Sequence, residues 1–331
     1  MFQLFFILLP RKINMMVNRR YLRTKVMQAI FAHTLNEKES IASGEKKLVN
    51  SIEGCYKLFL YFFLLFPTLK RYRLNKFEDL KNKINLTKED LSPNTKFADN
   101  LVIEQIEDNE TLKRLWIHYK VKFPEVHQDT IVQLYYDIEK MPEFENYMQR
   151  EERSYKEDKE IILEIIANCI VEHPQLHWLF GEMNVHWFDD YNEALSMMYL
   201  NIEDFKESKT TDNRISVLLK NNDDKDFYID LYRKTILRST EFETMIESKL
   251  RNWERERIMV MDMILMKMAL CELLEFPTIP VKVIINEYIE LAKTYSSAKS
   301  GIFINGLLDQ LLVQIKEEGK LHKIGRGLID N

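Results

Sequence analysis

Glycine and proline are scarce in this chain: its 331 residues contain only eight of each. Doubly wound sheets, barrels and sandwiches use these residues at their many turns, so the shortage favours long helices. Hydrophobic residues make up 46% of the chain and charged residues 30%, a balance that supplies enough apolar surface to offset the entropy lost on folding. The sequence therefore predicts a folded, soluble, all-α protein, long enough for two or three domain-sized units.

Positive charge is concentrated at one end of the chain. Residues 1–36 carry six Lys and Arg and no acid, whereas the remainder has 11 more acids than bases. The six cations are Arg11, Lys12, Arg19, Arg20, Arg23 and Lys25. A local basic patch on an acidic body indicates contact with a polyanion at one place.

Two apolar runs raise the question of a targeting or membrane-spanning segment. The run within residues 1–10 is followed, rather than preceded, by its charges, and no small-residue cleavage site comes after it, so a signal peptide is not expected. The run Leu58–Phe66 has nine residues, about half of the ~20 that cross a bilayer, and we expect a buried helix. Three cysteines without a CxxC spacing fit a reducing compartment. We therefore expect a cytoplasmic protein with no membrane partner.

Helical periodicity occurs at both ends of the chain. In residues 18–33 the apolar positions recur at three and four, and Arg19 and Arg23 lie beside the stripe that they form. The region between is also helix-like, as in residues 48–66, and short connections make the helices between 226 and 317 neighbours in a compact bundle. The last of these helices is expected to begin near Ser300 and carries Phe303, Leu307, Leu311 and Ile315.

Two motifs in the C-terminal third carry the strongest signal. They read IPVKVIINEYIELAKTY at 279–295 and FINGLLDQLL at 303–312. With these residues the chain resembles the NusB family of transcription antitermination factors, whose signature is a proline-started helix with Asn-Glu and Glu-Leu-Ala-Lys, a short loop, then Phe-Val-Asn-Gly-Val-Leu-Asp. The segment RRYLRTKVMQAIF at 19–31 is similar to the family's Arg-rich first helix. The matching motif residues are Asn286, Glu287, Glu290, Leu291, Ala292, Lys293, Phe303, Asn305, Gly306, Leu308 and Asp309.

The resemblance implies a NusB-like helical bundle interrupted by a large helical insertion. Residues 16–36 and 224–320 would form one discontinuous RNA-binding domain, with 37–223 as an insertion whose role the resemblance does not assign. Residues 1–15 are expected to be a non-functional N-terminal extension, because patterning begins only after them. Residues 321–331 are expected to be a C-terminal tail.

The resemblance also implies a function: a non-enzymatic RNA-binding factor for transcription antitermination, acting in ribosomal RNA transcription. In the family, such a protein binds single-stranded boxA RNA together with the ribosomal protein NusE, in the RNA polymerase antitermination complex. Guanidinium groups suit phosphates, and an aromatic ring can stack on an unpaired base. The implied RNA-binding residues are Arg19, Arg20, Arg23, Lys25, Lys299 and Phe303.

Some of these residues also fit structural roles. Phe303 is equally open to plain core packing. Asn305 and Gly306 are expected to serve structure, with Gly306 allowing two helices to approach closely.

Two other function classes remain open. NusB-like domains also form the N-terminal RNA-binding part of ribosomal RNA cytosine methyltransferases, but such an enzyme needs a further α/β domain with a Gly-rich cofactor loop and a catalytic Cys. The third class is a helical adaptor whose insertion binds protein and whose RNA role is lost. The affinity for boxA RNA, measured with and without NusE, distinguishes such an adaptor from an RNA-binding antitermination factor.

His173 and His177 have an HxxxH spacing, which can hold zinc when both histidines lie on one helix. Pro174 directly follows His173, which disfavours a continuous helix through both histidines. We therefore expect neither a metal site nor a cofactor.

Overall fold

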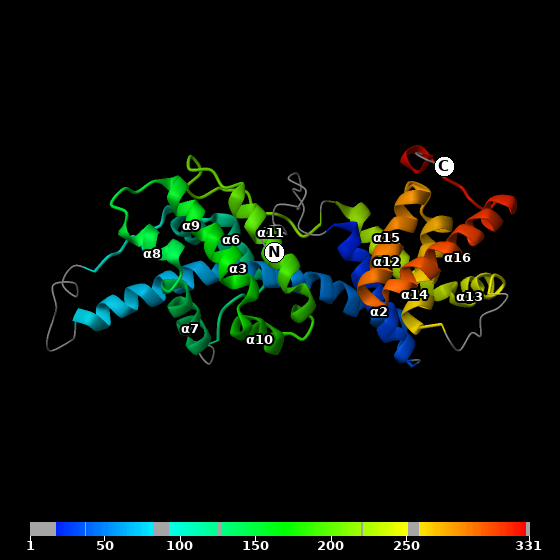
Figure 1. The fold of residues 1–331 in the computed structure, drawn as a ribbon, viewed down its shortest axis with the longest axis horizontal. Coiled ribbons are helices and arrows are strands. Elements are labelled where there is room, and N and C mark those ends of the chain that lie inside the picture. The colour runs from blue at the N-terminus through cyan, green and yellow to red at the C-terminus, as the bar shows by residue number, and fades with distance from the viewer. Residues whose placement is uncertain are drawn as a thin grey trace. The chain divides into compact units, whose positions relative to one another are not determined.

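The computed structural model describes residues 18–36, 38–81, 93–124, 128–219, 221–250 and 258–328. Its regular elements are helices, and these residues contain no strand, so the predicted all-α class is confirmed (Figure 1). The expected N-terminal extension, residues 1–15, lies outside the described residues.

The chain divides into two compact units. The insertion unit consists of the described part of residues 53–218, and the discontinuous unit of the described parts of 17–52 and 219–331. The long helix α3, Ile41–Lys81, contributes residues to both. The first segment of the discontinuous unit thus extends beyond the expected limit at residue 36, because the start of α3 contacts α12: Arg233 Nη2 donates to Glu45 Oε1 at 2.8 Å.

The insertion unit surrounds the apolar part of α3. Eight of the nine residues from Leu58 to Phe66 are buried, which confirms the expected buried helix. Residues 41–79 are long and apolar enough to cross a membrane by composition, but 72% of their apolar window is buried within the protein, as in the core helix of a globular fold. The helices around α3 are α5 (Leu101–Asp108), α6 (Glu110–His118), α7 (Gln128–Glu139), α8 (Pro142–Gln149), α9 (Tyr155–Asn168), the 3₁₀ turn η2 (Ile170–Glu172), α10 (Pro174–Met183) and α11 (Trp187–Glu203).

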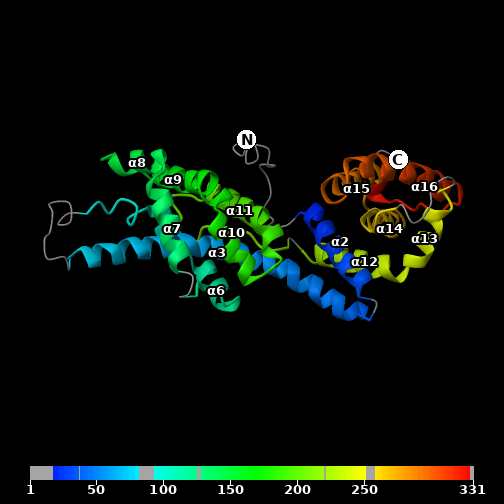
Figure 2. The same ribbon diagram turned by 60° about the horizontal axis from the view of Figure 1, so that its bottom comes forward.

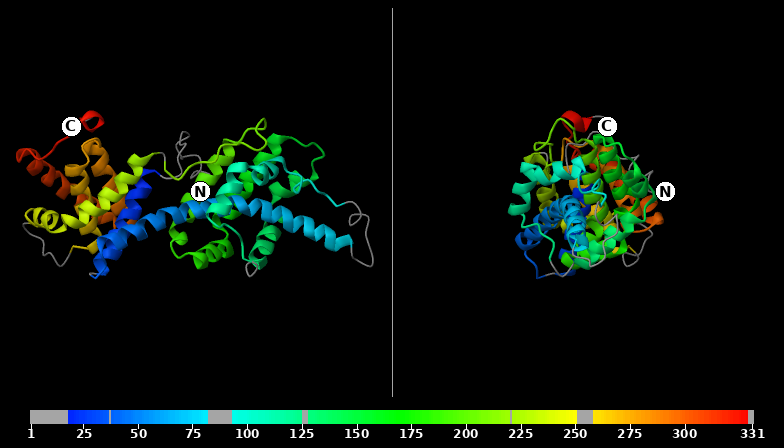
Figure 3. Two further views of the ribbon diagram at one scale, coloured as in Figure 1. Left: turned by 180° about the vertical axis from the view of Figure 1, so that it is seen from behind. Right: turned by 90° about the vertical axis from the view of Figure 1, so that its left-hand side faces the viewer.

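The discontinuous unit is built around α14. Ten of the sixteen residues of this helix are buried, and they lie on all sides of its axis, which is typical of a central helix. Helices α2 and α15 pack against it, and α2 also runs along α12, as Figures 2 and 3 show from two sides. The elements of this unit are α2 (Arg19–Leu35), the start of α3, α12 (Asn222–Leu237), α13 (Ser239–Glu247), α14 (Val260–Glu275), α15 (Val281–Tyr295), α16 (Ala298–Glu317) and the 3₁₀ turn η4 (Gly325–Leu328).

Helix α2 begins at Asn18, whose side chain accepts a hydrogen bond from the Tyr21 amide at 2.9 Å. The predicted stripe faces the core, since Leu22, Val26 and Ile30 are at most 5% exposed. The first helix and the C-terminal bundle therefore share one core, although about 190 residues separate them in the sequence.

The segment expected to be a C-terminal tail is docked on the bundle. Lys323 Nζ donates to the carbonyl oxygens of Glu272 and Phe276, at 3.3 and 3.0 Å, at the C-terminal end of α14. The Ile324 amide donates to Pro277 O at 3.0 Å, and a Cβ on Gly327 would lie 2.0 Å from the same oxygen. Residues 323–327 thus form part of the discontinuous unit.

Candidate nucleic-acid interface

Arg20 carries the most exposed guanidinium of α2. Its side chain is 55% exposed, and its Nε and Nη2 donate to the two carboxylate oxygens of Glu287 on α15, at 2.9 and 2.8 Å. Burial opposes ionisation of Glu287, but the hydrogen bonds from Arg20 and the charge of Arg23 outweigh it and lower the pKa of this carboxyl. Glu287 therefore stays negatively charged at neutral pH.

Arg19 lies one residue earlier and is also accessible. Its side chain is 40% exposed, and its Nε donates to Asp224 Oδ1 in the first turn of α12 at 3.2 Å. The guanidinium carbon lies 4.9 Å from the centre of the Phe227 ring, so the aromatic face helps to hold it.

Arg23 is buried, at 2% exposure, in an ion pair at the centre of the unit. Its Nε and Nη2 each lie 2.7 Å from a carboxylate oxygen of Glu272, and Tyr288 Oη donates to Glu272 at 2.7 Å. Burial would lower the pKa of Arg23, but the Glu272 carboxylate outweighs it and raises the pKa. The arrangement ties α2 to α14 and α15.

Lys25 is 2% exposed, with its ammonium 5.4 Å from the centre of the Tyr21 ring. The burial of Arg23 and Lys25 corrects the expectation that four cations of α2 are available to phosphates. Only Arg19 and Arg20 present their charge on the surface.

Lys299 and Phe303 lie at the start of α16. Ser297 caps this helix by accepting from the Ser300 amide at 3.1 Å, and Lys299 is exposed in the first turn. Phe303 is partly exposed, whereas Ile304 is fully buried. Ile304 fills the core position, and Phe303, for which the sequence left core packing and RNA contact open, is only partly covered.

The glycine of α16 that lies close to a neighbouring helix is Gly301, not Gly306. A Cβ on Gly301 would lie 3.2 Å from Lys293 Cγ and 3.7 Å from the Ile289 carbonyl oxygen on α15. Gly306 is exposed and has no atom within 4 Å of such a Cβ, so the expected close helix approach does not occur there.

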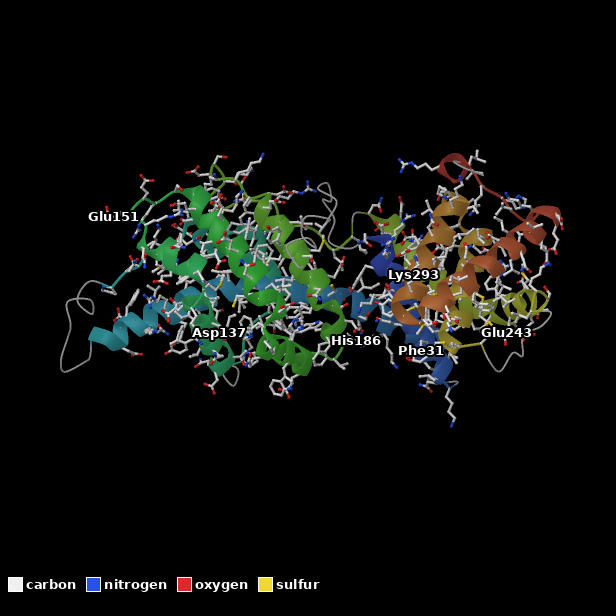
Figure 4. All side chains as sticks on the ribbon, viewed as in Figure 1. Phe31, Asp137, Glu151, His186, Glu243 and Lys293 are labelled. Carbon is white, nitrogen blue, oxygen red and sulfur yellow. The ribbon has the colours of Figure 1, made fainter. Side chains whose placement is uncertain are left out.

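Sequence reasoning missed Glu287 and Lys293 as parts of the surface. Lys293 is 53% exposed, donates to Glu290 at 2.7 Å, and lies against Gly301 at the start of α16; Figure 4 labels it on α15. Glu287 and Lys293 are six residues apart, about 9 Å along the helix axis. Their i, i+3, i+6 spacing with Glu290 was visible in the motif: Glu290 lies between them, about one helical turn from each. Helix α15 thus joins the arginine end of α2 to the start of α16.

The surface built from Arg19, Arg20, Lys293, Lys299 and Phe303, here called the α2–α15–α16 surface, contains its own counter-ions. Asp224, Glu287 and Glu290 pair with three of its four cations. In the described part of the chain, Lys299 makes no ion pair. The charge of the basic helix is therefore largely compensated within the fold.

The two units differ in net charge. The insertion unit, residues 53–218, contains 21 Lys and Arg and 31 Asp and Glu. The discontinuous unit, residues 17–52 and 219–331, contains 24 Lys and Arg and 21 Asp and Glu. Within the insertion unit, residues 160–205 contain nine acids and no Lys or Arg. A polyanion is repelled by such a surface, so the charge distribution favours contact at the discontinuous unit.

His173 and His177 have structural roles. His173 Nδ1 caps α10 by accepting from the Leu176 amide at 3.2 Å, and Pro174 is the first residue of that helix. The His177 ring stacks on Tyr191 with 3.4 Å between ring centres. Among the described residues no group of three or more His, Cys, Asp or Glu side chains is arranged to hold a metal ion.

Comparison with known proteins places these observations in a family. Residues 192–312, from within α11 to within α16, match the NusB family. Proteins named transcription antitermination protein NusB match part of the chain. The one from Salinibacter ruber is 44% identical over 105 residues, which cover 32% of this chain and 66% of the relative. The one from Chloroherpeton thalassium is 42% identical over 106 residues, which cover 32% of this chain and 50% of the relative. No solved structure matches the chain.

The chain thus spans between half and two thirds of the length of these two relatives. For the protein of the same name from Desulfatibacillum aliphaticivorans, the match is 36% identical over 97 residues and covers 29% of this chain and 68% of the relative. This coverage, together with the ordered motifs on α15 and α16, shows that the chain belongs to the NusB family.

Proposed function

We propose that this chain is a non-enzymatic, cytoplasmic RNA-binding factor of transcription antitermination in ribosomal RNA transcription. It binds single-stranded boxA-type RNA together with the ribosomal protein NusE, as part of the RNA polymerase antitermination complex. The relatives' shared name, transcription antitermination protein, supports the process. The observation that carries RNA contact is the exposed guanidinium of Arg20 on the same unit as an exposed Lys299 and a partly exposed Phe303.

The proposed mechanism is tethering, and it requires no turnover. Arg19, Arg20, Lys293 and Lys299 supply charge to phosphates, and the Phe303 ring offers a face for one unpaired base. Arg23 does not touch RNA; its ion pair with Glu272 holds α2 in the orientation that presents Arg19 and Arg20.

Binding of fluorescently labelled single-stranded boxA RNA to the full chain, with and without purified NusE, tests this proposal. We expect the Arg20→Gln/Lys299→Gln variant to bind more weakly than wild type in both conditions. The matched control is Arg114→Gln, which removes an exposed arginine of α6 in the acidic insertion unit. Equal affinities of wild type and the double variant would reject the assigned surface.

A protein-interaction adaptor is the second candidate, and one observation favours it. The segment 160–205, which lacks Lys and Arg, carries two exposed aromatic side chains, Trp178 and Phe188, at 57% and 52% exposure. An exposed aromatic pair in an acidic setting suits a basic protein partner. In this case NusE binds the chain, but the affinity for boxA RNA is no higher than for an unrelated single-stranded RNA of equal length.

A further inference from the structure

The ion pair of Arg20 and Glu287 has the geometry in which a guanidinium holds a phosphate. Two parallel N–H groups of Arg20 point at two carboxylate oxygens, at 2.9 and 2.8 Å. A phosphate offers the same pair of acceptors to the same fork. Glu287 thus occupies the donors that an RNA phosphate would need.

The buried network beneath this pair has its main acid in Glu272, and Glu287 is a more distant partner of Arg23. Arg23 already has two hydrogen bonds to Glu272 at 2.7 Å, and its nearest approach to Glu287 is 3.7 Å. Glu287 is 17% exposed at the side chain and Arg20 is 55% exposed, so the pair lies at the edge of the fold, where solvent and ligands reach it. Exchange of the acceptor on Arg20 therefore leaves both hydrogen bonds between Arg23 and Glu272 in place.

We propose that Glu287 is an intramolecular competitor for RNA: it occupies the phosphate-binding fork of Arg20, and a phosphate binds Arg20 by displacing it. This inference rests on the proposed function and assigns the residue that sets affinity at the proposed surface. Each contact made through Arg20 then exchanges one anion for another, so it gains less than a contact with an unpaired arginine. Asp224 is a weaker competitor, because it holds Arg19 through a single hydrogen bond at 3.2 Å.

The test measures the dissociation constant of the full chain for labelled single-stranded boxA RNA over a series of salt concentrations. Glu287→Gln keeps the size of the side chain and removes its charge. We expect binding about two- to fivefold tighter, the range of an exposed ion pair. We also expect the slope of log affinity against log salt to become steeper by up to about 0.7, the value for one phosphate contact on a single strand.

The chain offers a matched control in the same unit. Arg238, the residue between α12 and α13, donates through Nε and Nη2 to the two oxygens of Glu241 in the first turn of α13, at 2.8 and 2.6 Å, and its Nη1 also bonds Glu275. Glu241→Gln removes the same charge from the same kind of pair away from α2 and α15, and we expect it to leave RNA affinity within about 1.5-fold of wild type.

The double variant Arg20→Gln/Glu287→Gln distinguishes the possible failures. If Glu287 competes for Arg20, the gain from Glu287→Gln disappears in the Arg20→Gln background. If Arg20→Gln alone leaves affinity unchanged, the proposed interface is wrong at Arg20. If Arg20→Gln weakens binding but Glu287→Gln does not tighten it, or tightens it equally without Arg20, the interface stands and the competitor role is overturned. Thermal unfolding of each variant checks that its fold is retained.

Discussion

Two arginines of α2 stand three residues apart and form different kinds of ion pair. Arg23 and Glu272 are 3% and 0% exposed at their side chains, whereas Arg20 is 55% exposed. Water screens the outer pair and cannot replace either partner of the inner one. Removing one partner of a buried pair leaves an uncompensated charge and costs about 3–5 kcal/mol, against about 0–1 kcal/mol for an exposed pair.

We therefore expect Arg23→Met to lower the free energy of unfolding of the full chain by about 3–5 kcal/mol, because Glu272 loses its guanidinium partner. Arg20→Met should lower it by about 0–1 kcal/mol. Urea denaturation followed by circular dichroism measures both. The assignment of Arg23 to the core fails if the two variants are equally stable.

His173 makes the insertion unit sensitive to acid. Burial lowers its pKa from the usual 6.5, opposed by the carboxylate of Asp137, 3.5 Å from Nε2, and assisted by the charge of His177. The folded state therefore favours the neutral ring, whose Nδ1 accepts the capping hydrogen bond. The neutral His173 ring contributes fully to the free energy of unfolding above pH 6.5, and this contribution is lost as the pH falls through the lowered pKa of His173.

This predicts a fall in the melting temperature of the wild-type chain between pH 7 and pH 5 that is smaller in His173→Asn, because asparagine also caps a helix but does not titrate in this range. Melting curves at several pH values measure it. An identical pH dependence in both proteins would show that His173 does not contribute.

At the scale of elements, the corner between α15 and α16 sets what Phe303 can do. Gly301 lets α16 start close to α15, and Ile304 then faces the core while Phe303 stays at the edge. The proposed stacking of Phe303 on a base uses this partly exposed position.

Phe303→Ala is accordingly expected to weaken boxA RNA binding by about 1–3 kcal/mol, and Phe303→Leu to lose most of the same binding, because leucine has no π-face. Ile304→Ala, its neighbour, should instead destabilise the fold by about 2–5 kcal/mol. Binding and thermal unfolding are measured on all three variants. If Phe303→Ala melts as early as Ile304→Ala and Phe303→Leu binds normally, Phe303 is a core residue.

Local patterns predicted the existence of α2, α15 and α16, since each has an apolar stripe and a recognisable start. The same patterns do not reveal features that depend on contacts between residues far apart in the sequence. The pattern of α3 predicted a helix over 48–66, yet the helix continues through Pro67 to Lys81, because packing of the apolar residues before it offsets the lost amide hydrogen bond. The burial of Arg23 depends on Glu272, 249 residues later, which no local spacing reveals.

In the whole molecule, the unit that carries the proposed interface is built from two segments that lie far apart in the sequence. Helix α2 packs on α12 and α14, and its described contacts begin at Asn18. The acidic insertion unit separates these segments in sequence and has the opposite net charge.

A chain that starts at Met16 should therefore fold and bind boxA RNA as well as the full chain, because it retains the cap and all of α2. A chain that starts at Ser40 lacks α2 and should lose both RNA affinity and much of its stability, since Glu272 is left buried without Arg23. Circular dichroism and RNA binding are compared for the two. Loss of binding on removal of residues 1–15 would contradict the prediction for the shorter deletion.

Neutralisation of RNA phosphates by the α2–α15–α16 surface makes the affinity for RNA depend on the salt concentration. Affinity for single-stranded boxA RNA is measured over a salt series for wild type and for Arg19→Gln/Arg20→Gln/Lys299→Gln. Each lost phosphate contact should reduce the slope of log affinity against log salt by about 0.7, so we expect the slope of the triple variant to be shallower by up to about 2. Parallel slopes for the two proteins would contradict it.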